Sequence, residues 1–293
     1  FARVCAPDSF VASPDVAGFA SAKDHGVPYM SDINTIGDMY EFRRDIPWYD
    51  DDSAGFGASR ADQEDKVIAG NTFDYPAIHG AALMESGYSF VSASVAAVEN
   101  GIVDMKQYKL ADLILGKQKE TQIGRGEVPN RFLAFTAPLQ KAIADYTANG
   151  GSILVSGSYV ATDIWDKTNP DEASKEFAKQ TLGYQWRVGQ ATIEGKAHTV
   201  PTYFDSFGDL NVEYYTTLND KFYAVESPDG IYPADKTKGS TLTRYGENNI
   251  PAAVVADQGG YRTCVMGFPF ETIKDAASRR ALMGQIMEFF NKK

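Results

Sequence analysis

Residues 152–163 read SILVSGSYVATD and follow directly on Asn149-Gly150-Gly151. The run SILVSG is almost continuously apolar, which is typical of a strand that is buried on both faces. Small residues come next, and the turn after such a strand is where many α/β enzymes carry their nucleophile. The stretch therefore predicts a central strand and a tight turn that presents Ser158 or Ser156.

The chain from residue 66 onward alternates between strand-like and helix-like segments. Leu139, Ile143 and Tyr146 recur at helical spacing and predict a helix over about 138–148. Such alternation favours right-handed crossovers and parallel strands. We therefore expect an α/β fold with three layers, in which helices flank a mostly parallel sheet. The expected strands are KVIAG (66–70), YSFVSAS (88–94), ADLILGKQ (111–118) and SILVSGS (152–158), with a further helix over 77–86.

The second half of the chain has a different sequence pattern. After an expected helix over 171–182, short alternating segments are broken by Gly, Pro and Asn, which predicts an antiparallel insertion over about 186–250. AAVVAD and YRTCVMGFPFE then predict a hairpin around Gln258-Gly259-Gly260. Leu282, Ile286 and Phe289 predict a last helix over about 278–290.

Residues 1–65 are irregular and rich in Asp, Gly, Pro and aromatic side chains, with strand-like pieces at Ala2–Ala6 and Met39–Arg43. Their aromatic content predicts an N-terminal extension that packs on the core, which we place at 66–293. The chain begins at Phe1, without Met or a signal peptide. We interpret it as a processed or excised piece of a longer protein.

Composition limits the classes of partner. The 293 residues carry 39 acidic and 28 basic side chains and a net charge of −11, which argues against a nucleic-acid partner. No apolar run approaches the roughly 18 residues of a membrane span. Cys5 and Cys264 lie in apolar runs and are interpreted as buried thiols, although a disulfide between them stays open. His25, His79 and His198 are too far apart in sequence for a zinc motif.

Two stretches, ADYTANGGSILVSGSY (144–159) and VMGFPFETI (265–273) with RRALMGQIMEFF (279–290), carry a resemblance. Over about Lys66–Asn291 the chain resembles the class I glutamine-amidotransferase-like, flavodoxin-like fold, in its non-glutaminase branches such as the trimerisation domain of β-galactosidases. Residues 17–19 (AGF), 24–29 (DHGVPY), 37–59 and 69–80 also resemble the C-terminal region of secreted Bacteroidetes proteins labelled xanthan lyase. This second resemblance implies a secreted, periplasmic or cell-surface multidomain setting related to polysaccharide.

The resemblance to the amidotransferase-like fold also argues against glutaminase activity. The family mechanism needs a Cys at the turn after the strand, with a His and a Glu downstream, because the thiolate attacks the amide and the His is its base. This chain has Gly157-Ser158 at the turn. Where the family has His-Pro-Glu, it has Phe268-Pro269-Phe270-Glu271. Both the thiol and the base are absent from these positions.

Ligands of open α/β sheets bind beyond the carboxyl ends of the strands. Three loops are expected there, at 71–76, 116–121 and 157–163. Their carboxylate, amide and aromatic groups would suit a sugar, although the same mixture occurs on many ordinary loops. The candidate substrate-binding residues are Asn71, Tyr75, Lys117, Gln118, Tyr159 and Asp163.

The candidate catalytic residues are Ser158, His79 and Asp74. Ser158 lacks the G-x-S-x-G pattern, so the alternative is a turn of small residues that lets helix and strand approach closely. His79 lies near a helix start, where the dipole favours a neutral imidazole that could act as a base. Its alternative is a packing histidine. Asp50-Asp51-Asp52 lacks EF-hand spacing and is interpreted as a solvated turn, so we predict no metal and no cofactor.

Three hypotheses follow. The first is a non-glutaminase amidotransferase-like module with a structural or glycan-binding role in a larger secreted protein. The second is a polysaccharide lyase or hydrolase, in which Lys117 or Arg125 would stabilise the charge that follows proton abstraction. The third is an oligomerisation or interdomain module, in which residues 1–65 dock other domains of the same chain.

Overall fold

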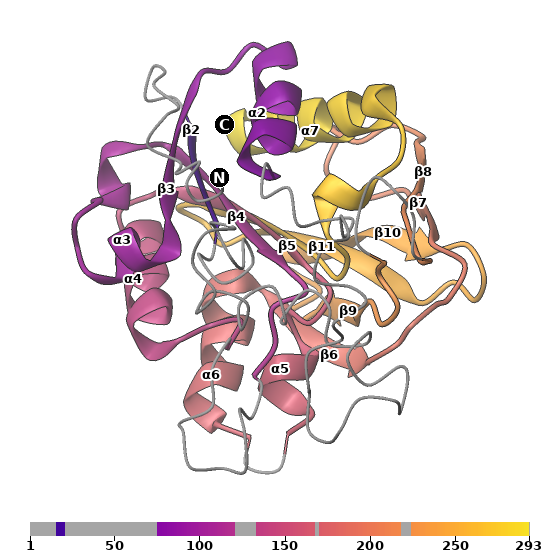
Figure 1. Ribbon diagram of the computed structural model, residues 1–293, viewed down its shortest axis with the longest axis horizontal. Helices are drawn as coiled ribbons and strands as arrows, with labels where there is room; N and C mark the ends of the chain where they lie inside the picture. The colour runs from indigo at the N-terminus through magenta and orange to yellow at the C-terminus, as the bar shows by residue number, and fades with distance from the viewer. Residues whose placement is uncertain (1–15, 21–74, 121–132, 168–169, 218–223, 293) are drawn as a thin grey trace, which may run out of the picture.

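A computed structural model describes residues 16–20, 75–120, 133–167, 170–217 and 224–292. The predicted strand at 66–70, the two strand-like pieces of the N-terminal segment, Cys5 and the acidic turn at 50–52 lie outside these ranges. Within them the chain forms a nine-stranded sheet, a small two-stranded sheet and helices on both faces of the large sheet (Figure 1).

One half of the large sheet is parallel. β2 (Val16–Ala20) lies between β3 (Phe90–Ser94) and β4 (Leu110–Gly116), and β4 pairs with β5 (Ser152–Gly157). The expectation that the strands at 111 and 152 lie side by side and point the same way is confirmed. β2 comes from the segment that we assigned to the N-terminal extension, and it supplies an inner strand of the sheet.

The other half is antiparallel. β12 (Arg262–Met266) pairs parallel to β5, and every later neighbour alternates in direction. The remaining strands of the large sheet are β11 (Pro251–Asp257), β10 (Gly239–Tyr245), β7 (Lys196–Thr199) and β8 (Asn211–Glu213), and the small sheet joins β6 (Tyr184–Val188) to β9 (Gly230–Pro233).

The expectation of a mostly parallel sheet is therefore wrong. The described strands make four parallel and five antiparallel pairings, so the protein is a mixed α/β structure. The reason lies in the connections, because a short loop joins only antiparallel strands whereas a parallel neighbour needs a long crossover. The predicted hairpin between β11 and β12 is confirmed, and the expected antiparallel strands between 186 and 250 extend the sheet from it.

Helices cover both faces of the sheet. α2 (Tyr75–Glu85) and α7 (Ala276–Asn291) pack together on one face and bury a core that includes Leu83, Leu282 and Ile286 (Figure 1). The opposite face carries α3 (Val95–Glu99), α4 (Ala137–Ala148), α5 (Thr162–Trp165) and α6 (Glu172–Phe177). Short helical turns complete the order at Met105–Gln107 (η4), Ala178–Leu182 (η5) and Phe270–Thr272 (η6).

The predicted helix before the central strand forms because its ends are well specified. The Thr136 hydroxyl accepts a hydrogen bond from the Leu139 amide and caps α4. The helix ends at Ala148, Asn149 is its C-cap, and Gly150 follows with a φ of +86°. Tyr146 donates to the Ser152 carbonyl at 3.0 Å, and a Cβ at Gly151 would lie 2.2 Å from the Tyr146 ring. The Gly therefore permits the tight connection from α4 into β5.

Two further expectations concern single features. Cys264 is a free thiol in the core, and burial raises its pKa. Among the described helices, none combines the length and the apolar character that crossing a bilayer requires.

Candidate functional site

His79 lies in the interior between two carboxylates. Its Nδ1 lies 2.7 Å from Asp112 Oδ2 and its Nε2 lies 3.2 Å from Glu271 Oε2, both within hydrogen-bond distance. The histidine is 1% exposed, and both carboxylate residues are fully buried. We call these three residues the histidine cluster.

Three separate elements build the histidine cluster. Asp112 lies on β4, on the face that Leu110 and Ile114 also turn toward α2 and α7. Glu271 lies on η6, directly after β12. α2 packs closely on the sheet, because a Cβ at Gly80 would lie 2.1 Å from the Phe90 ring. This close approach brings His79 down to the level of the Asp112 carboxylate.

The charge state of His79 follows from these contacts. Burial alone would lower the pKa of the imidazole, but the ion pair and hydrogen bond with Asp112, and then those with Glu271, raise it to about 9. The neutral imidazole expected from the helix position is therefore not favoured, because two nearby carboxylates outweigh both the helix dipole and desolvation. A protonated ring whose two nitrogens both donate has no lone pair with which to accept a proton.

Ser158 begins the loop after β5, as predicted. Its backbone amide donates to the Gly116 carbonyl at 2.8 Å, which holds the turn against the end of β4. Its side chain is buried, and neither its hydroxyl nor that of Ser156 has a hydrogen-bond partner within the described part of the chain. Since both nitrogens of His79 are taken by carboxylates, His79 is not positioned to activate Ser158.

The loops after β4 and β5 do come together, as the topology predicted. The Asp163 carboxylate accepts from the Glu120 amide at 2.6 Å and from the Ala134 amide at 2.7 Å. The Lys119 ammonium lies 5.2 Å from the centre of the Tyr159 ring. Burial raises the pKa of Asp163, although the two amides act in the opposite direction.

The other candidate binding groups in these loops also contact protein. The Lys117 ammonium lies 2.6 Å from a Glu226 carboxylate oxygen and is almost fully buried. The Gln118 side-chain amide donates to the Leu133 carbonyl at 2.7 Å. These loops are therefore tied together by the groups that we expected to face a ligand. Tyr75 begins α2, and its side chain lies outside the described part, as do Asn71 and Asp74.

Asp229 is a further buried carboxylate that sequence reasoning missed. It accepts hydrogen bonds from the backbone amides of Ala161 (2.7 Å) and Thr162 (2.8 Å), at the start of α5. Its own amide donates to the Gly267 carbonyl at 2.7 Å, and Tyr245 donates to its carbonyl at 2.7 Å. Burial raises the pKa of the Asp229 carboxyl to about 7, although the hydrogen bonds from Thr162 and Ala161 act in the opposite direction.

The sequence signals the three missed carboxylates, Asp112, Glu271 and Asp229, to different degrees. Asp112 is the single carboxylate inside the apolar run LADLILG, which signals a buried charge that needs a partner. Glu271 lies in the segment compared with His-Pro-Glu, but nothing local ties it to His79. Asp229 lies in an ordinary Pro-Asp-Gly sequence just before β9 and carries no signal.

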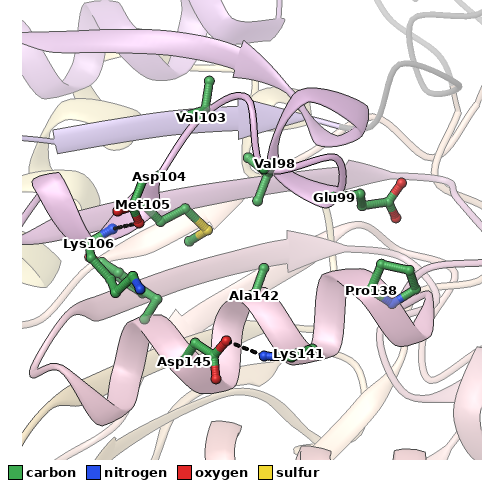
Figure 2. A pocket seen from close by; sticks show the side chains of 12 residues that line it. Val98, Glu99, Val103, Asp104, Met105, Lys106, Pro138, Lys141, Ala142 and Asp145 are labelled. Carbon is green, nitrogen blue, oxygen red and sulfur yellow. Dashed lines mark hydrogen bonds and ion pairs between the residues drawn. The ribbon is translucent and has the colours of Figure 1, made fainter.

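A cavity of about 440 Å³ lies between α3, η4 and α4, on the helical layer (Figure 2). Its floor includes Val98 and Met105. Charged groups of both signs surround it and partly pair with one another, since Lys141 contacts Asp145 at 2.5 Å. The two lining lysines, Lys106 and Lys141, face three carboxylates, those of Glu99, Asp104 and Asp145. The lining therefore carries no excess of positive charge that would attract an anion.

Within the described residues, no group of three or more His, Cys, Asp or Glu side chains is arranged to hold a metal ion.

No protein-family profile and no curated protein matches the chain. Among solved structures, it is similar to a β-galactosidase from Rahnella sp. R3, at 13% identity and a TM-score of 0.49, over 94% of this chain and 31% of that one. It is similar to an exo-β-1,4-mannosidase from Opitutaceae bacterium strain TAV5, at 10% identity and a TM-score of 0.48, over 96% and 36%.

A glutamine amidotransferase from Methylobacillus flagellatus is a weaker structural neighbour, at 8% identity and a TM-score of 0.39, over 73% of this chain and 90% of that one. The chain spans about a third of the length of the two glycosidases. The activities in those names belong to those proteins.

Proposed function

We propose that this chain is a non-catalytic α/β module of a larger secreted protein, with a glycan-binding role. The observation that carries its non-catalytic part is the position of His79, whose two ring nitrogens both lie within hydrogen-bond distance of buried carboxylates. A general base needs a free lone pair within reach of the proton that it removes. The histidine cluster has none to offer, so its chemistry is that of an internal ion cluster that holds α2 on the sheet.

The loops at the ends of β4 and β5 support the same proposal. Asp163, Gln118 and Lys117 each bind protein groups, and this keeps the loops in one arrangement. Nucleophilic catalysis would instead need Ser158 within hydrogen-bond distance of a base. The described residues place no imidazole there, and the hydroxyl is buried.

A polysaccharide panel that contains neutral and uronate-rich polymers tests the proposal. Binding is followed by affinity electrophoresis, and turnover by new reducing ends and by the absorbance of unsaturated uronates. We expect binding without turnover. The lyase or hydrolase hypothesis is favoured instead if the chain cleaves a polymer and Ser158→Ala, which removes only a hydroxyl without a described partner, abolishes cleavage while the protein stays folded.

The setting within a larger protein is part of the proposal and needs its own test. A glycan-binding module that serves a neighbouring catalytic domain should raise that domain's rate on polymer but not on soluble oligomers. We expect removal of this module from the complete protein to slow turnover of polymer selectively. An equal loss on both substrates would instead favour a structural role.

A further inference from the structure

A second cavity, of about 470 Å³, lies where the β9–β10 turn meets η5 and the end of β11. We call it the lysine pocket. Its volume is within the range of sites that hold a small ligand. The lining residues that carry polar side chains are Lys179, Gln180, Asp235, Lys236, Thr237, Lys238 and Gln258.

The charge of the lysine pocket is opposite to that of the chain as a whole. Three ammonium groups line it against the single carboxylate of Asp235, although the chain carries a net charge of −11. The Asp235 carboxylate is already used inside its own turn, where Oδ1 accepts from the Thr237 amide at 2.8 Å and from the Thr237 hydroxyl at 2.7 Å. These bonds lower the pKa of Asp235 and keep it ionised.

The lysines of the lysine pocket are available to a ligand. Within the described part of the chain, no carboxylate lies in ion-pair distance of Lys236 or Lys238. Lys179 contacts Glu176 at 3.1 Å in a solvent-facing pair, which is a weak interaction that an incoming anion can replace. Three like charges around one cavity repel one another, and an anion between them relieves that repulsion.

Backbone hydrogen bonds join the elements that frame the lysine pocket. The Ala234 amide donates to the Gly183 carbonyl at 3.0 Å, and the Asp257 amide donates to the Lys238 carbonyl at 2.9 Å. Gly183 has a φ of +81°, and a Cβ there would lie 2.8 Å from the Gln258 side-chain nitrogen. The absence of a side chain at Gly183 thus leaves room for the Gln258 amide in the wall. A fixed backbone frame reduces the ordering cost of binding.

We propose that the lysine pocket binds an anionic, hydroxyl-rich ligand, namely a carboxylate-bearing saccharide. The ammonium groups suit the carboxylate, and the amides of Gln180 and Gln258 both donate to and accept from hydroxyls. No aromatic side chain is among the lining residues, so a nucleotide would find no ring on which to stack its base. The choice of a saccharide rests on the glycan-binding function proposed above, whereas the choice of an anion rests on the lysines alone.

The test is calorimetric titration of the intact chain with four probes: an oligogalacturonate, a neutral cello-oligosaccharide, inorganic sulfate and an acidic peptide. The double variant Lys236→Glu with Lys238→Glu is compared with the matched control Lys106→Glu with Lys141→Glu, which makes the same change of charge around the α3–α4 cavity. We expect the oligogalacturonate to bind the wild type and the control alike. The Lys236/Lys238 variant should lose at least about tenfold in affinity, and binding should weaken with salt.

Each other outcome has a distinct meaning. Equal binding of sulfate or of the acidic peptide overturns the saccharide assignment. Binding of oligogalacturonate that both double variants retain overturns the lysine pocket but leaves a glycan-binding module. Binding of the neutral oligosaccharide alone also overturns the lysine pocket and leaves a glycan-binding module. If no saccharide binds, the glycan-binding function fails together with this inference, and if the chain cleaves a saccharide, only its non-catalytic character fails.

Discussion

Replacement of Asp112 by Asn should flatten the pH dependence of stability between about pH 6.5 and pH 9. In the folded protein the pKa of His79 is raised from 6.5 to about 9, mainly by Asp112. At about 1.4 kcal/mol per pKa unit, this difference corresponds to about 3 kcal/mol of stability. Asn keeps the shape of the side chain and an oxygen that can accept from His79, but it removes the charge.

The sign follows from proton binding. Above about pH 6.5 the unfolded histidine loses its proton, whereas the folded one keeps it until about pH 9, so the folded state binds more protons throughout this window. The stability that the raised pKa of His79 contributes is fully present below pH 6.5 and is lost as the pH rises through about 9. The wild-type free energy of unfolding should therefore fall across the window, with a steepest slope of about 1.4 kcal/mol per pH unit.

The assay is urea unfolding at half-unit steps across this window, with heteronuclear NMR of the His79 ring in the folded state. Asp112→Asn should be about 2 kcal/mol less stable than wild type near pH 6.5, because a charged hydrogen bond is lost, and the two curves should converge toward pH 9. Asp145→Asn, which removes an exposed carboxylate, should run parallel to wild type. Parallel curves for Asp112→Asn, or a His79 ring that titrates near 6.5, would refute the reasoning.

Four further predictions concern the turn after β5 and its surroundings. Asp229→Ala should cost about 3 kcal/mol in chemical unfolding near neutral pH, because the amides of Ala161 and Thr162 lose their buried acceptor. Asp229→Asn should gain stability relative to wild type as the pH rises from about 4 to about 7. The reason is that the wild-type carboxyl loses its proton over this range, and burial of the resulting charge destabilises the wild-type fold. A difference in thermal midpoint that stays constant with pH would contradict this. Ser158→Ala should change the free energy of unfolding by less than about 0.5 kcal/mol, because the hydroxyl has no partner among the described residues, and a loss above about 2 kcal/mol would reveal one. Gly267→Ala should destabilise the protein by more than about 2 kcal/mol in the same assay, because the new Cβ would lie 2.2 Å from the Asp229 carbonyl oxygen. A neutral result would mean that the segments around Gly267 and Asp229 can move apart without cost.

The sequence by itself determined the local elements of this protein. The apolar runs of β4 and β5, the capped helix α4 between them and the β11–β12 hairpin all follow from patterns within about 10 to 15 neighbouring residues. Their parallel pairing also follows, since a helical crossover between adjacent strands leaves few alternatives. For the same reason, the meeting of the loops after β4 and β5 could be predicted.

The tertiary structure alone decided which charges meet and how the sheet is completed. His79 finds its carboxylates 33 and 192 residues away, and no local pattern encodes partners at such distances. β2 enters the middle of the parallel half from a segment without a clear strand signal, and the antiparallel half grows from a hairpin that could have joined either edge. Periodicity reports only whether a face is buried. The pKa of His79 and the charge of the lysine pocket depend on what packs against that face, which the long-range pairing of the whole chain determines.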